Sequence, residues 1–234
     1  MNLKNATSLV TGGSSGIGHA IARSLIAAGA RVAITGRNQE RLAQAAQELG
    51  AHPVQADVSK EADVQRTMQE VLATFGHLDI LVNNAGVGVF TPLVDLDLAT
   101  FERIFATDVT GAMLMAREAA RHFIGRKRGN IVNIGSTASH RGAANGTAYY
   151  AAKFALRGMT ECWRAELRKH NIRVFLVNPS EVITNFGAAA GVEQKENPTK
   201  LLPEDIAQAV KAVLEMDDRG FTTELTIFAT NPVD

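Results

Sequence analysis

The sequence of 234 residues contains one cysteine, no surplus of charge of either sign and no long apolar run. Because Cys162 has no partner, an internal disulfide is excluded, and we expect a cytoplasmic protein. Lys plus Arg and Asp plus Glu both number 24, so no overall field favours nucleic acid or an acidic membrane. No stretch of about 18 apolar residues predicts a membrane span, and the N-terminus lacks the apolar segment of a signal peptide.

The rest of the composition is that of a globular protein. The six histidines show no spacing typical of a metal site, so we expect no metal. There is no internal repeat, low-complexity tract or interdomain linker. The length suffices for one large core, and we therefore expect a single domain over residues 1–234.

Short apolar runs alternate with longer stretches of helical periodicity. We expect strands at 8–11, 31–35, 53–56, 80–83, 129–134, 173–178 and 224–228. We expect helices at 16–28, 39–48, 61–75, 98–126, 147–169 and 203–216. This alternation predicts an α/β fold, a doubly wound Rossmann domain with about seven parallel strands and helices on both faces. The long connection 185–202 is interpreted as a substrate lid, with a flexible surface loop as the alternative.

A glycine-rich turn follows the first expected strand and reads Gly12-Gly13-Ser14-Ser15-Gly16-Ile17-Gly18. Glycine permits a close backbone approach, and the N-terminus of the next helix offers N–H groups to a pyrophosphate. The spacing Gly-x-x-x-Gly-x-Gly differs from the Gly-x-Gly-x-x-Gly fingerprint, and such a turn can also be purely structural. Its place between strand and helix favours phosphate binding.

The end of the second expected strand bears on cofactor choice. An acid there would bind the ribose 2′-OH of NAD, whereas an arginine accommodates the 2′-phosphate of NADP. Gly36 stands in the acid's place and Arg37 follows, which predicts NADP(H) over NAD(H). Ser14, Ser15 and Asn38 can add neutral hydrogen bonds. The alternative is that Arg37 is a solvated surface residue.

Tyr149 and Lys153 lie four residues apart, on one face of an expected helix. A neighbouring ammonium favours the phenolate and lowers the pKa of a tyrosine, so the pair can act as a general acid/base. Such pairs are also common on ordinary helix surfaces. Phe154 lies four residues after Tyr150, so the spacing selects Tyr149 instead.

Four motifs in order resemble the short-chain dehydrogenase/reductase family over essentially the whole chain. They are residues 11–18, Asn83-Asn84-Ala85-Gly86, Ser136 and the pair Tyr149 and Lys153. Within the family, the sequence most resembles bacterial carbonyl reductases of the 3-oxoacyl-carrier-protein reductase group. The resemblance implies an NADP(H)-dependent oxidoreductase that transfers hydride reversibly between nicotinamide and a ketone, aldehyde or alcohol, with a 3-oxoacyl thioester as one candidate. The Asn-Asn-Ala-Gly run can also be a plain turn.

The resemblance also implies roles for individual residues. Tyr149 would be the acid/base, Lys153 would lower its pKa and hold the nicotinamide ribose, and Ser136 would bind the substrate oxygen. The implied contacts at the pyrophosphate and nicotinamide are Gly12, Gly16, Ile17 and Gly18. Those at the adenine are Asp57 and Val58, and those at the adenosine ribose are Asn83, Ala85 and Gly86. The segment that begins at Pro179 would add Val182 at the carboxamide and Thr184 at the phosphates. A small-molecule substrate and a homodimer or homotetramer are implied as well.

Two positions depart from the family pattern. Asp108 stands where the family usually has the Asn of a proton relay, and we include it with the candidate catalytic residues. A buried carboxylate near Lys153 would alter the electrostatics, although Asp108 can equally serve helix structure alone. Ser180 replaces a glycine after Pro179.

Two other functions are weighed against the oxidoreductase. An NADP(H)-binding sensor or scaffold with little turnover conflicts with the intact set of Ser136, Tyr149 and Lys153, while Asp108 leaves it some room. A sugar-nucleotide epimerase would need a larger substrate domain than this chain can hold.

Overall fold

The computed structural model describes residues 1–184, 186 and 199–231. Within this part of the chain, seven parallel strands form one sheet in the order β3-β2-β1-β4-β5-β6-β7. The strands are β1 (Thr7–Val10), β2 (Arg31–Gly36), β3 (His52–Gln55), β4 (Ile80–Asn83), β5 (Gly129–Ile134), β6 (Ile172–Pro179) and β7 (Glu224–Ile227). The strand order reverses between β1 and β4, so the predicted doubly wound Rossmann sheet is confirmed.

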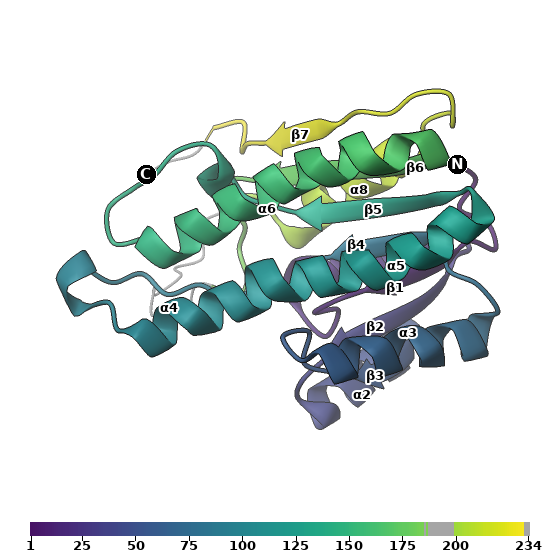
Figure 1. Ribbon diagram of the computed structural model, residues 1–234, viewed down its shortest axis with the longest axis horizontal. Coiled ribbons are helices and arrows are strands. Elements are labelled where there is room, and N and C mark those ends of the chain that lie inside the picture. The colour runs from purple at the N-terminus through teal and green to yellow at the C-terminus, as the bar shows by residue number, and fades with distance from the viewer. Residues whose placement is uncertain (185, 187–198, 232–234) are drawn as a thin grey trace.

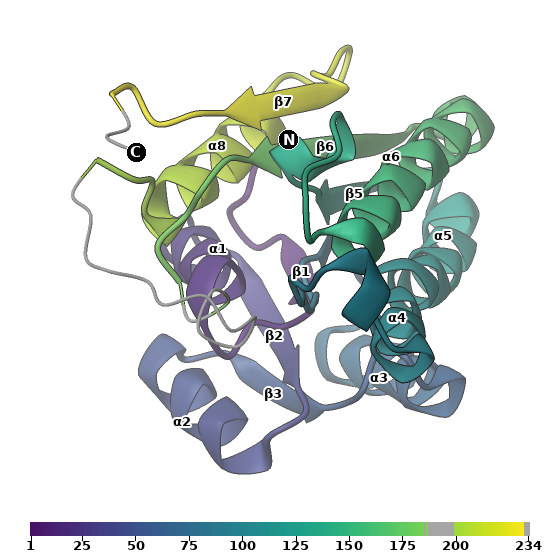
Figure 2. The same ribbon diagram turned by 90° about the vertical axis from the view of Figure 1, so that its left-hand side faces the viewer.

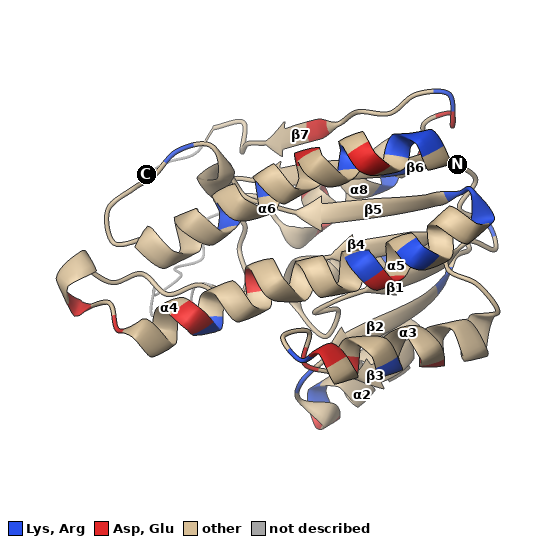
Figure 3. Cartoon of the chain, viewed as in Figure 1, with Lys and Arg blue, Asp and Glu red and all other residues tan. Residues whose placement is uncertain are grey.

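Helices cover both faces of the sheet (Figures 1 and 2). One face carries α1 (Gly16–Ala27), α2 (Gln39–Leu49) and α8 (Pro203–Glu215). The other carries α3 (Glu61–Phe75), α4 (Leu98–Phe105), α5 (Ala112–Arg126) and α6 (Thr147–Leu167). Acidic and basic residues are interspersed on the helices α3, α5 and α6 (Figure 3). None of the helices that the structure describes is both long and apolar enough to cross a bilayer.

The hydrophobic core lies in two layers, one on each side of the sheet. Every residue of β1, β4, β5 and β6 is buried, as expected for central parallel strands covered on both faces. Ile21 and Leu25 of α1 pack into one layer, and Met115 and Phe123 of α5 pack into the other. The sheet is therefore a rigid platform on which the loops at its carboxyl edge are held.

The expected helix 98–126 is interrupted in its middle. Between α4 and α5 the chain forms a π-helical turn, η2 (Ala106–Gly111), whose backbone stays helical on both sides. Such wide turns are rare in proteins, and those that occur are often found at functional sites. Short 3₁₀ turns that were not expected follow β4 and β5, namely η1 (Leu93–Asp95) and η3 (Thr137–Ser139). Of the predicted lid 185–202, all but Phe186 and 199–202 lies outside the described residues.

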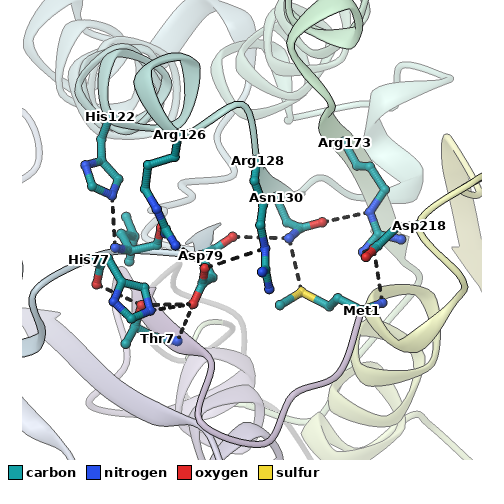
Figure 4. Close-up of polar contacts among 11 residues, drawn as sticks. Met1, Thr7, His77, Asp79, His122, Arg126, Arg128, Asn130, Arg173 and Asp218 are labelled. Atoms are coloured by element: carbon teal, nitrogen blue, oxygen red, sulfur yellow. Dashed lines mark hydrogen bonds and ion pairs between the residues drawn. The ribbon is translucent and has the colours of Figure 1, made fainter.

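A polar cluster ties together the amino ends of β1, β4, β5 and β6 (Figure 4). The buried carboxylate of Asp79 accepts from the amide of Thr7 at 3.0 Å and pairs with Arg126 at 3.0 Å and His77 at 3.1 Å. Arg173, also buried, donates to Asn130 at 2.8 Å and to the carbonyl of Leu214 at the end of α8 at 3.0 Å. A cation at a helix C-terminus stabilises that end.

We expect Asp79→Asn to lower the free energy of unfolding by about 2–3 kcal/mol at pH 7, because it leaves the charge of Arg126 without its partner. Burial alone would raise the pKa of Asp79, but the Thr7 amide and Arg126 outweigh it and hold that pKa below its ordinary value. The stabilisation by the Asp79 carboxylate is therefore complete above its pKa in the unfolded chain, about 3.9. It is lost as the pH falls through the lower pKa of Asp79 in the folded protein.

Urea denaturation of wild type and variant across the acid range measures this difference. Asp95→Asn, at an exposed position of η1, is the matched control and should leave stability unchanged within about 0.5 kcal/mol. A difference between wild type and Asp79→Asn that persists below both pKa values would show that its origin is not the ionised carboxylate.

Candidate active site

The glycine turn joins β1 to α1 in a shape that only glycine adopts easily. Gly12 and Gly16 have left-handed backbone angles, φ +65° and +55°. A Cβ atom on Gly18 would lie 2.5 Å from the carbonyl oxygen of Gly12, so the helix passes directly against the turn. The side chain of Ser15 does not cap α1, which leaves the first N–H groups of that helix for a ligand.

The end of β4 holds this turn in place. Asn84 donates its side-chain amide to the carbonyls of Thr11 at 2.9 Å and Gly12 at 3.2 Å. The hydroxyl of Thr11 in return accepts from the backbone amides of Asn84 and Ala85, both at 3.0 Å. Asn83 instead points into the protein and donates to the carbonyl of Ala112 and to the side chain of Asn133. Asn84 was not among the predicted site residues, yet it shapes the turn.

A cleft of about 420 Å³ opens at the carboxyl edge of the sheet, where doubly wound folds bind ligands. Most of the predicted cofactor residues line it, namely Gly12, Ser14, Ser15, Gly16, Ile17, Arg37, Asp57, Val58, Ala85, Gly86, Pro179, Val182 and Thr184. Gly18, Asn38 and Asn83 do not line it. Its two positive-φ glycines, open helix N-terminus and elongated lining from β2 to β6 fit a dinucleotide.

One end of the cleft, beside β2 and α2, carries two arginines. Arg37 was predicted there, and Arg41 of the first turn of α2 joins it in the lining. Asn38 accepts from the amide of Arg41 at 2.8 Å and so caps α2. A Cβ atom on Gly36 would lie 3.2 Å from the hydroxyl of Ser14, which leaves little room for an acidic side chain. Arg41 was missed, although it lies one helical turn beyond Arg37.

The other end of the cleft carries Ser136, Tyr149 and Lys153. Ser136 follows β5 and is the N-cap of η3, its hydroxyl accepting from the amide of Ala138 at 3.1 Å. The ammonium of Lys153 lies 5.5 Å from the centre of the Tyr149 ring on α6. Burial raises the pKa of Tyr149, while the charge of Lys153 and the hydrogen bond with Ser136 oppose that rise. The predicted catalytic residues are thus brought together, with Asp108 behind Lys153.

Asp108 does not line the cleft but lies directly under it. The π-helical turn buries its side chain, which is 1% exposed, and its Oδ1 accepts from the amide of Val87 at 2.7 Å. Its Oδ2 lies 3.3 Å from Nζ of Lys153. Burial raises the pKa of Asp108, and the charge of Lys153 opposes the rise. Burial alone would lower the pKa of Lys153, but Asp108 and Tyr149 outweigh it and raise that pKa.

Three aromatic rings lie around Tyr149, and one of them, Phe186, also lines the cleft. The rings of Phe90 and Phe186 both have their centres 5.6 Å from that of Tyr149, and Tyr150 follows at 6.1 Å. Across the described residues, no group of His, Cys, Asp or Glu is placed to hold a metal ion. The arrangement therefore offers a proton donor, a cation and a hydroxyl at an apolar opening.

Comparison with known proteins agrees with this geometry. The family model for short chain dehydrogenases matches residues 6–195. An uncharacterised oxidoreductase of Bacillus subtilis, YxnA, is 35% identical over 93% of this chain, which spans 65% of that protein. The 3-ketoacyl-(acyl-carrier-protein) reductase of Brucella melitensis, solved with NADH, superposes with a TM-score of 0.91 at 30% identity, covering 97% of this chain and 98% of the other. A metagenomic short-chain oxidoreductase solved with NADP superposes with a TM-score of 0.86 at 34% identity, covering 99% of this chain and 100% of the other.

We expect Gly18→Ala to weaken dinucleotide binding tenfold or more, which corresponds to about 1.4 kcal/mol, because the new methyl group would displace the turn. Fluorescence titration with NADPH and with NADH measures the dissociation constants. Gly158→Ala is the matched control, since that glycine is exposed on α6 with no atom within 4 Å of its Cβ position. It should raise stability by about 1 kcal/mol and leave binding unchanged. Equal binding by Gly18→Ala and wild type would contradict the role given to this close approach.

Proposed function

Because the chain belongs to the short-chain dehydrogenase/reductase family, we propose that it is an NADP(H)-dependent oxidoreductase that interconverts a ketone or aldehyde with its alcohol. The observation that carries the proposal is the meeting of Ser136, Tyr149 and Lys153 at one end of a cleft whose wall includes the glycine turn. The chemistry needs a proton donor and stabilisation of charge on the substrate oxygen, and these three side chains supply both.

The nicotinamide, when bound, supplies the hydride. The hydroxyl of Ser136 binds the substrate oxygen, and the phenol of Tyr149 donates a proton to it in the reducing direction. The ammonium of Lys153 favours the phenolate that is left behind and holds the nicotinamide ribose. The glycine turn and the N-terminus of α1 would hold the pyrophosphate, with Thr184, which lies against Gly16, as a further contact.

The preference for NADP(H) is supported by charge. Arg37 and Arg41 both line the cleft beside β2, and a guanidinium forms charge-assisted hydrogen bonds with a phosphate. Asn38 is engaged in capping α2 and supports Arg41 through its backbone. The absence of a side chain at Gly36 removes the acid that would favour NAD(H).

A 3-oxoacyl thioester is one candidate substrate, supported by the likeness to the reductase from Brucella. We also place the protein in the cytoplasm as a homodimer or homotetramer. Ile124 of α5 and Phe154 of α6 are 39% and 44% exposed, which supports packing through these helices. The sensor or scaffold remains the second candidate, because Asp108 stands where the resemblance implies the asparagine of a proton relay.

We expect Tyr149→Phe to lower kcat/KM for carbonyl reduction by about 10²–10⁴-fold, because the proton donor is lost. NADPH oxidation across a panel of ketones and aldehydes measures the rates, and fluorescence titration should show unchanged NADPH affinity. Tyr150→Phe, with no lysine four residues later, is the matched control. Full activity of Tyr149→Phe would remove Tyr149 from its role. Tight NADPH binding by wild type with no turnover of any compound would support the sensor.

We expect Arg37→Asp to weaken NADPH binding by about ten- to a hundredfold and to reverse the preference toward NADH, because the carboxylate repels a 2′-phosphate and accepts from a 2′-OH. Arg41→Ala should weaken NADPH binding less and leave NADH binding unchanged. Dissociation constants for both cofactors, measured side by side, test this. Arg219→Asp, at a position remote from the cleft, is the control for the change in net charge. Unaltered selectivity in Arg37→Asp would exclude Arg37 as the determinant.

A further inference from the structure

We propose that Asp108 is a positioning residue whose carboxylate compensates the charge of Lys153 and thereby keeps Tyr149 in the proton-donating form that carbonyl reduction requires. The inference rests on the proposed role of Tyr149. It adds a pH dependence to that role, because reduction needs the protonated phenol whereas alcohol oxidation needs the phenolate.

The contacts of Asp108 fix its carboxylate in one orientation. Oδ1 is held by the amide of Val87, so Oδ2 faces Lys153. Oδ2 is buried and makes no hydrogen bond in the described part of the chain, which leaves the ammonium of Lys153 at 3.3 Å as its electrostatic partner. A Cβ atom on Gly86 would lie 2.9 Å from Oδ2, so the carboxylate occupies space that is open only because residue 86 has no side chain.

Lys153 is equally confined. It is 6% exposed, and its ammonium donates to the carbonyl of Ile134 at 3.2 Å. That contact and the carboxylate of Asp108 draw the ammonium toward the interior, while the ring of Tyr149 lies 5.5 Å away. A carboxylate in direct contact with an ammonium offsets much of the electrostatic potential that the ammonium produces at a third group a few ångströms further away.

Few other charges face the phenol of Tyr149. Its own helix contributes Lys153 and the neutral Tyr150, η2 contributes Asp108, and the end of β5 contributes Ser136. Arg103 of α4 lines the same cleft. On the segment after β6, Glu181 is exposed and pairs with Lys200. Burial and the charges of Lys153 and Asp108 therefore govern the ionisation of Tyr149, and a charge-removing substitution at position 108 alters only the second of these.

The direction of the effect follows from the signs of these charges. An uncompensated ammonium nearby lowers the pKa of an acid by about 1 to 3. The negative charge of Asp108 repels the phenolate and so offsets part of this lowering. It therefore favours the neutral phenol, which donates a proton during reduction. Alcohol oxidation needs the phenolate as the base, so its rate rises only at a higher pH.

Asp108→Asn tests the proposal, because asparagine keeps the shape and an acceptor for the amide of Val87 but removes the charge. The chain has only two tyrosines, so in a Tyr150→Phe background the absorbance of phenolate reports Tyr149 alone. We expect Asp108→Asn in this background to lower the apparent pKa of Tyr149 by about 1 to 2, because the ammonium of Lys153, which still donates to the carbonyl of Ile134, then acts on the phenol without compensation. Asp95→Asn in the same background is the control for a lost surface carboxylate and should change nothing.

Kinetics provide the second readout. In Asp108→Asn, the pH at which reduction loses activity and the pH at which oxidation gains it should both be lower than in the background variant. Both should shift by the same amount as the apparent pKa of Tyr149, because one ionisation governs both directions. An unchanged or higher apparent pKa of Tyr149 in a variant that melts within a few degrees of its background would overturn the proposal. The titration requires no turnover, so a protein inactive on every carbonyl would refute the proposed function while the titration still tests Asp108.

Discussion

The hydrogen bonds between Asn84 and the chain from Thr11 to Gly12 are the constraint on which the site depends. They join the ends of β1 and β4, the two strands between which the order of the sheet reverses. Together with the amide of Gly13, which donates to the carbonyl of Thr35 at 3.0 Å, they hold the left-handed turn at Gly12 against α1. The glycine-turn end and the Tyr149 end of the cleft are parts of one framework, since the same loop after β4 continues to Gly86 and Val87 and so reaches Asp108.

The sequence was sufficient to predict the architecture because central parallel strands have short apolar runs in the sequence. All seven strands were predicted within a few residues of their observed bounds. The spacing of Tyr149 and Lys153 along α6 is local information and predicted their pairing, whereas Ser136 was placed beside them by the family resemblance. The π-helical turn could not be predicted, since one extra residue per turn leaves no mark in the periodicity of 98–126. The resemblance also suggested a carboxylate near Lys153, but the direct contact of Asp108 with Lys153, 45 residues apart in the sequence, required the folded structure.

Side chains with similar sequence contexts have different tasks in the folded protein. Asn83 and Asn84 are adjacent, but strand alternation turns Asn83 into the core and Asn84 toward the glycine turn. Arg37 and Asn38 are also adjacent, yet the arginine lines the cleft while the asparagine caps α2. A motif therefore identifies a region reliably, whereas the task of each residue within it depends on where the backbone directs the side chain.

The polar cluster around Asp79 (Figure 4) joins the amino ends of the strands, whereas the cleft opens at their carboxyl ends. Asp79 and Asp108 are both buried, but Asp79 pairs with Arg126 and His77, whereas Asp108 faces Lys153 beneath the cleft. None of the side chains that hold Asp79 lines the cleft. Substitutions in the cleft and substitutions in the cluster can therefore change activity and stability independently.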